Sequence, residues 1–162
     1  MVGFIMFLKG EPLMSGMIRE MRERDRECVL RMMRVFYASP AVLSNGSEEI
    51  FRSDIDACLS DSPYLEGYVV EYKGEVQGYA MVAKSFSTEF GKPCIWIEDL
   101  YVKGECRGLG LGGSLLDYIK ETYKDCVLRL EAEEENEGAV SLYRRKGFQV
   151  LPYLEMITGV GN

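Results

Sequence analysis

A glycine-rich loop, Arg107-Gly-Leu-Gly-Leu-Gly-Gly-Ser114, lies between a predicted strand and a predicted amphipathic helix. Glycines at such a position let backbone N–H groups face outward at the start of the helix, where the helix dipole also favours negative charge. Both features suit a diphosphate group, and a Cβ atom would block its close approach. The loop therefore predicts a binding site for a diphosphate-bearing cofactor.

A dinucleotide fingerprint is an alternative interpretation of the same loop. Gly108, Gly110 and Gly113 match G-x-G-x-x-G, and Glu131 follows at about the spacing of a ribose-binding acid. Three observations count against it. Residues 103–107 separate the loop from its strand, that strand carries acidic residues, and too few residues follow for the rest of a doubly wound sheet.

The apolar pattern away from the loop predicts an α+β domain with one mixed central β-sheet and flanking helices. Helices are expected from Asp25, the predicted N-cap, after Ser47, out of the glycine loop and from Asn136. The predicted strands are 17–21, 67–72, 75–86, 94–102, 127–132 and 148–156, with a tight hairpin at Lys73-Gly74. Residues 17–157 are expected to form a single domain. Residues 1–16 are expected to be a leader outside its core, with Met14 or Met17 as the natural start.

The loop and the residues after it resemble one family. Arg107-x-x-Gly110-x-Gly112 resembles the Arg/Gln-x-x-Gly-x-Gly/Ala pyrophosphate loop of the GNAT superfamily of N-acetyltransferases. The matching region spans roughly residues 69–148, because the strand 128–130 and the run Asn136, Ala139, Leu142-Tyr143 and Gly147-Phe148 also resemble that family. The resemblance implies a GNAT-like acyl-CoA N-acyltransferase fold. It also implies acetyl-coenzyme A, or a close acyl-coenzyme A, as co-substrate.

In the GNAT family the strand before the loop splays from its downstream neighbour, and pantetheine lies in the gap. The resemblance therefore implies cofactor contacts from the end of that strand, the loop and the later helix. The implied cofactor-binding residues are Leu100, Tyr101, Val102, Arg107, Gly108, Leu109, Gly110, Leu111, Gly112, Gly113, Asn136, Ala139 and Tyr143.

Acetyl transfer to an amine needs a neutral nucleophile, and a free alkyl amine with a pKa of about 10.4 is almost entirely charged at pH 7. The chain has no histidine, so the base must be a carboxylate, a tyrosine or a water chain. Glu98 is the predicted base, because the strand 96–102 is similar to that of polyamine (diamine) acetyltransferases, where the matching glutamate works through water. Asp99 is the alternative, since a bulge in this strand could turn either side chain toward the cleft.

Tyr143 is the implied catalytic acid, because the family places a tyrosine there to protonate the departing sulfur. Glu98, Asp99 and Tyr143 can each also be interpreted without a catalytic role. The two carboxylates could be solvated groups at a strand end, and Tyr143 could be a core aromatic.

Composition limits the classes of partner. The 162 residues carry a net charge of −7, which argues against nucleic acid and leaves room for a cationic acceptor. Five cysteines without a Cys-x-x-Cys pair indicate reduced thiols, no metal site and a cytoplasmic location. No apolar run is long enough to cross a membrane, and residues 1–8 lack the flanks of a signal peptide. The sequence leaves a homodimer open.

The acceptor is predicted only as a primary amine of a small molecule, with polyamine-like or amino-acid-like compounds as leading candidates. Segments 36–46 and 87–93 are expected to shape its pocket, with Phe36, Tyr37 and Phe90 as candidate walls. Two alternatives stay open: an enzyme that acetylates protein or peptide amines, and a non-catalytic acyl-CoA sensor or interaction module on the same fold.

Overall fold

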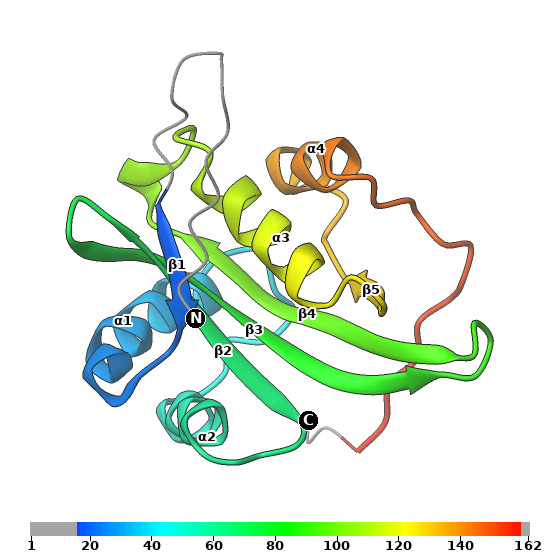
Figure 1. Ribbon diagram of the computed structural model, residues 1–162, viewed down its shortest axis with the longest axis horizontal. Helices are drawn as coiled ribbons and strands as arrows, with labels where there is room; N and C mark the ends of the chain where they lie inside the picture. Colours follow the sequence, from blue (N-terminus) through cyan, green and yellow to red (C-terminus); the bar gives the residue numbers. More distant parts are fainter. Residues whose placement is uncertain (1–15, 160–162) are drawn as a thin grey trace.

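The computed structural model describes residues 16–159, which contain a five-stranded sheet in the order β1-β2-β3-β4-β5 (Figure 1). Neighbouring strands are antiparallel except β4 and β5, which are parallel, so the predicted mixed sheet is confirmed. Nearly all of the predicted leader lies outside the described residues. The strands are β1 (Met17–Glu20), β2 (Leu65–Tyr72), β3 (Glu75–Ser87), β4 (Lys92–Val102) and β5 (Val127–Leu130).

Two helices cover each face of the sheet (Figure 1). One face carries α1 (Arg26–Tyr37) and α2 (Glu48–Leu59), and the other carries α3 (Leu111–Thr122) and α4 (Glu137–Arg145). Within residues 16–159, no helix has the length and apolarity needed to cross a bilayer. The strand before the glycine loop pairs antiparallel with β3 instead of sitting in a doubly wound parallel sheet, so the dinucleotide interpretation is wrong.

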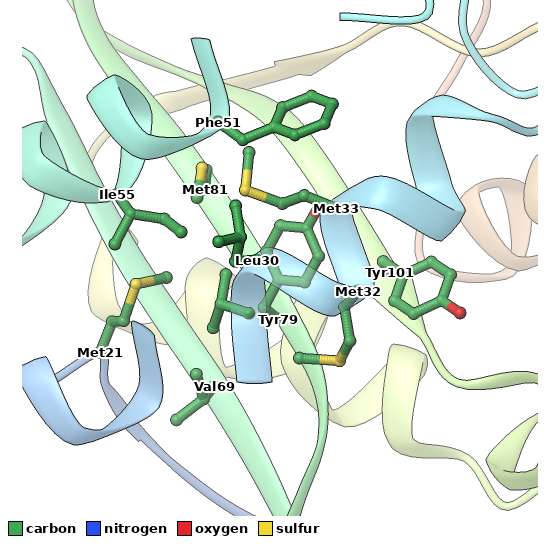
Figure 2. Packing of buried hydrophobic residues seen from close by; sticks show 11 residues of the cluster. Met21, Leu30, Met32, Met33, Phe51, Ile55, Val69, Tyr79, Met81 and Tyr101 are labelled. Carbon is green, nitrogen blue, oxygen red and sulfur yellow. The ribbon is translucent and has the colours of Figure 1, made fainter. Parts of the chain in front are cut away.

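Helical spacing of apolar residues explains the core under α1 and α2. Leu30 and Met33 of α1 and Ile55 of α2 are fully buried against Tyr79 and Met81 of β3. Figure 2 shows these side chains packed together, with Met32 and Tyr101 at the margin of the cluster. In the same view the Tyr101 hydroxyl points away from the other labelled side chains.

Local signals at element ends mostly act as predicted. Ser47 caps α2, its Oγ accepting a hydrogen bond from the Ile50 N–H at 3.2 Å. The hairpin turn lies at Lys73-Gly74, both with positive φ, as a two-residue turn requires. Asp25 is an exception. It is buried, and its carboxylate accepts two hydrogen bonds from the Arg19 guanidinium at 2.6 and 2.9 Å instead of capping α1.

The last predicted strand, 148–156, does not form. Residues 146–158 carry no strand, and side chains 149–159 are exposed. Pro152 cannot donate a backbone hydrogen bond, and β5 offers an edge of only four residues. The segment is instead tied to the β3–β4 turn, where the Tyr153 hydroxyl donates to Glu89 Oε1 at 2.7 Å.

Candidate active site

A bulge in β4 determines which way its acidic residues face. In the antiparallel ladder of β3 and β4, Met81 pairs with Asp99 and Val82 pairs with Ile97. Glu98 therefore has no partner residue on β3. The extra residue reverses the alternation of side chains along the strand. Ile97 lies in the core beneath α3, whereas Asp99 and Tyr101 turn toward α1 and α2. Without the bulge Asp99 would share the α3 face with Ile97; with it, Asp99 faces α1 and Glu98 is left exposed.

Asp99 lies inside the protein beneath α1 and is only 3% exposed. Its two carboxylate oxygens accept hydrogen bonds from the hydroxyls of Tyr37, at 3.0 Å, and Tyr79, at 2.8 Å. Burial raises the pKa of Asp99 from 3.8 to about 6, even though both hydroxyl donors stabilise the charged form. At neutral pH Asp99 is therefore a mostly ionised carboxylate in an apolar setting, with both of its oxygens already engaged.

The raised pKa of Asp99 predicts a cost to folding that grows with pH. The folded protein holds the proton more tightly than the unfolded chain, so ionisation between about pH 4 and pH 7 destabilises the fold. Asp99→Asn removes this titration. We expect the difference in unfolding free energy, variant minus wild type, to be about 2–3 kcal/mol higher at pH 8 than at pH 4, so the variant gains stability relative to wild type as pH rises. Denaturant melts at both pH values measure this, and a pH-independent difference would contradict it.

Glu98 is exposed at the bulge, and no described residue hydrogen-bonds to its carboxylate. Its partly desolvated position raises its pKa, and the nearby charges of Asp54 and Glu155 act in the same direction. The pKa of Asp54, on α2, is raised by burial as well. No described cation pairs with Asp54, Glu98 or Asp99, so this part of the site is a concentrated negative field.

The β4–β5 pair opens at the bulge. The parallel ladder joins Cys94–Ile97 to Val127–Leu130 and ends there, whereas β4 continues to Val102. From Glu98 onward the edge of β4 opposite β3 has no strand partner among the described residues. The backbone groups of Leu100, Tyr101 and Val102 lie along this stretch, so an extended ligand with amide groups could pair there as a strand does.

The glycine loop ends at an uncapped helix. Gly110 is the N-cap residue of α3 with φ +82°, a conformation that favours glycine, and it offers no side chain to the first turn. The first helical hydrogen bond runs from the Ser114 N–H to the Gly110 carbonyl at 2.9 Å. No described residue accepts from the N–H groups of Leu111, Gly112 and Gly113, and such groups at a helix start attract anions.

Side chains of the loop serve packing. Leu109 and Leu111 belong to the core beneath α3, so only their backbone faces the loop interior. A Cβ on Gly112 would lie 3.4 Å from Leu142 of α4, which shows how closely the two helices approach. Arg107 is exposed; its Nε donates to the Val102 carbonyl at 3.3 Å, and its guanidinium lies 5.9 Å from the Tyr101 ring centroid.

Helix α4 carries the remaining predicted residues. Tyr143 packs edge-to-face against Phe148, and its hydroxyl makes no hydrogen bond to any described residue. Burial raises the pKa of Tyr143, which keeps it protonated at neutral pH. Asn136 caps the helix, its Oδ1 accepting from the Ala139 N–H at 3.3 Å, so this pair has a structural role independent of any cofactor.

Comparison with known proteins identifies the family. The model of the acetyltransferase (GNAT) family matches residues 13–148. The chain is 34% identical to the thialysine N-epsilon-acetyltransferase of Bos taurus over 152 residues, which cover 86% of this chain and 87% of that protein. The chain belongs to the GNAT family of acetyltransferases. This confirms the resemblance seen in the sequence and extends it upstream of residue 69.

Other comparisons agree with a GNAT enzyme. The spermine/spermidine N(1)-acetyltransferase of Bacillus subtilis strain 168 is 28% identical over 101 residues, 57% of this chain and 66% of that protein. A possible acetyltransferase from Clostridium difficile 630 has a TM-score of 0.76 at 21% identity, covering 91% of this chain and 99% of that chain, which supports the fold.

The aromatic residues predicted to wall the acceptor pocket of this GNAT enzyme do not all meet. Phe36 and Tyr37 stack edge-to-face, with ring centroids 5.2 Å apart, and Phe36 also lies near Tyr101. Phe90 contacts the Arg129 guanidinium at the β3–β4 turn instead. Its predicted role beside Phe36 and Tyr37 has no support in these contacts.

Sequence reasoning missed Asp54 and Tyr79, which build the acidic part of the site of this acetyltransferase. Asp54 lies on the buried face of α2, three residues after Phe51 and one before Ile55, so a carboxylate at an apolar helix position was the available signal. Tyr79 was one of two aromatic residues in the predicted strand 75–86. Only the pairing of β3 with β4 brings its hydroxyl to Asp99.

Proposed function

We propose that this enzyme transfers the acetyl group of acetyl-CoA to a primary amine of a small cationic molecule, by direct attack in a ternary complex. The bulge at Glu98 carries the proposal. It places one carboxylate at the open edge of β4 and a second, Asp99, on the side of α1 and α2. Glu98 can therefore contact an amine beside the edge of β4 that is free for a cofactor, and the buried Asp99 adds negative charge behind it.

The residues present fit acetyl-CoA. The free edge of β4 suits the amides of pantetheine, and the uncapped N–H groups of α3 with Gly108 and Gly110 suit its diphosphate. When bound, the cofactor supplies a thioester whose acyl carbon accepts the amine. Asn136 keeps its amide nitrogen for the cofactor arm while its oxygen caps α4.

The reaction needs two proton transfers, one from the acceptor ammonium and one to the departing sulfur, and a different residue performs each. Glu98 accepts a proton from the acceptor ammonium, directly or through water, because its raised pKa makes it a better base than an ordinary glutamate. Tyr143 stays protonated and donates to the departing sulfur, since its hydroxyl is not committed to another residue. Asp99 and its two tyrosines hold the acceptor side of the bulge in place.

The acidic field favours an acceptor with more than one positive charge. Asp54, Glu98 and Asp99 lack a described cation, and a second ammonium on the acceptor would neutralise part of that field. The named relatives act on thialysine and on spermine or spermidine, which supports an acceptor of this kind. The five cysteines are free thiols, which supports the cytoplasm as the compartment.

A panel of amines incubated with acetyl-CoA tests the proposal by release of free thiol. We expect diamines and basic amino acids to be acetylated faster than monoamines of the same length. Gly112→Glu should remove both turnover and the thermal shift caused by acetyl-CoA, because it adds negative charge at the uncapped N–H groups. Gly138→Glu, which places the same side chain in open space on α4, is the matched control.

Two outcomes of this test would contradict the proposal. Unchanged acetyl-CoA affinity in folded Gly112→Glu would remove the diphosphate site from the glycine loop. Tight acetyl-CoA binding without thiol release from any amine would favour a sensor on the same fold.

A further inference from the structure

A hollow of about 420 Å³ lies between α1 and the segment that joins β4 to the glycine loop. We call it the α1 hollow. It is large enough for a small ligand. Three basic side chains line it, Arg31, Lys103 and Arg107, with Glu105 as the one acid of the lining.

The charge of the α1 hollow is opposite to that of the chain. The protein carries a net charge of −7, and basic residues near the hollow in sequence are paired: Arg26 with Asp56 at 2.6 Å and Arg34 with Glu48 at 2.6 Å. Arg31, Lys103 and Arg107 form no ion pair with any carboxylate of residues 16–159. Glu105 offsets only one of the three positive charges, so the basic side chains still repel one another, and a bound anion would relieve that repulsion.

The remaining wall of the hollow is apolar. Met32, Val35 and Tyr101 line it, and Val35 is 57% exposed. Figure 2 shows Met32 and Tyr101 side by side at the margin of the core. The flat face of a nucleobase can pack against such a wall, whereas inorganic phosphate would leave the wall exposed to water. A ligand with a planar ring and a phosphate matches both parts of the lining.

We propose that the α1 hollow binds a phosphorylated nucleoside, with Arg31 and Lys103 contacting a phosphate and the apolar wall contacting the base. Two sources share this chemistry. One is the nucleotide end of coenzyme A, which carries a 3′-phosphate and would be close by, since Arg107 belongs to both the hollow and the glycine loop. In that case the inference rests on the proposed function. The other source is a free nucleotide.

The test compares two cofactors on the full chain. Isothermal titration gives the Kd of acetyl-CoA and of 3′-dephospho-acetyl-CoA for wild type, Arg31→Ala and Lys103→Ala. If the cofactor is the source, wild type should bind acetyl-CoA about tenfold more tightly, the scale of a charged hydrogen bond. Each variant should lose most of that preference, and added salt should shrink it in wild type.

Lys92→Ala is the matched control, because it removes one exposed lysine from the opposite end of β4. It should keep the full preference for the 3′-phosphate. Loss of the preference in Lys92→Ala as well would show a general charge effect and overturn the proposal.

A free nucleotide is tested with adenosine 3′,5′-bisphosphate on protein saturated with 3′-dephospho-acetyl-CoA. If the cofactor preference is absent, the bisphosphate should still bind wild type and fail to bind Lys103→Ala. Absence of both the preference and bisphosphate binding overturns the proposal, even when amine acetylation is intact. A protein that acetylates nothing and binds no acetyl-CoA would refute the proposed function, and the bisphosphate titration alone would then decide the role of the hollow.

Discussion

Tyr143→Phe is expected to lower kcat by about 10²–10⁴-fold, the usual effect of removing a positioned acid. The change removes a hydroxyl group that hydrogen-bonds to no described residue, so the stability of the fold should change little. The affinity for acetyl-CoA should stay within about twofold, because the ring that packs against Phe148 is retained. Single-turnover measurements at saturating cofactor isolate the chemical step from product release.

Tyr118→Phe is the matched control for this experiment. Tyr118 belongs to the same core beneath α3, and its ring packs edge-to-face on Tyr68. It should keep near-normal kcat. If Tyr143→Phe behaves like Tyr118→Phe, Tyr143 is a core aromatic and the thiolate takes its proton from water.

Glu98→Gln is expected to slow kcat/KM near neutral pH by about 10²–10⁴-fold and to recover partly at high pH. A carboxylate base works only when ionised, so wild-type kcat/KM should rise as pH increases through its pKa, which lies above the ordinary glutamate value. Glutamine cannot accept the proton. At high pH more of the amine is already neutral, so the variant should approach wild type, whereas a damaged pocket would stay slow at every pH.

Asp99→Asn decides between the two neighbours of the bulge. In wild type, kcat/KM could rise with pH around pH 6. If that rise disappears in Asp99→Asn while Glu98→Gln behaves as wild type, Asp99 is the base. Glu75→Gln, at the start of β3, controls for the loss of one surface charge. If neither site variant changes the shape of the pH profile, the acceptor loses its proton before it reaches the site.

Local signals were enough for much of the fold. Helical spacing predicted α1 and α2, and the hairpin at Lys73-Gly74 lies where the turn residues predicted it. These features depend on residues close together in the chain, whose conformational preferences act without help from distant parts. The strand predicted at 148–156 failed because alternation alone does not provide a partner edge, and Pro152 weakens the pairing further.

The sequence predicted the glycine loop and the two acidic residues before it, but not how the side chains around β4 meet. The sequence by itself determined that a glycine loop starts α3 and that Glu98 and Asp99 precede it, because these depend on residue type and order. The tertiary structure decided which way each carboxylate faces, since that follows from a one-residue slip in the pairing of β3 with β4. It also brought Tyr37 and Tyr79 to Asp99, and Arg31 to Lys103. These groups lie on different elements. The pairing of β3 with β4 brings Tyr79 to Asp99, and the packing of α1 on the sheet brings Tyr37 to Asp99 and Arg31 near Lys103.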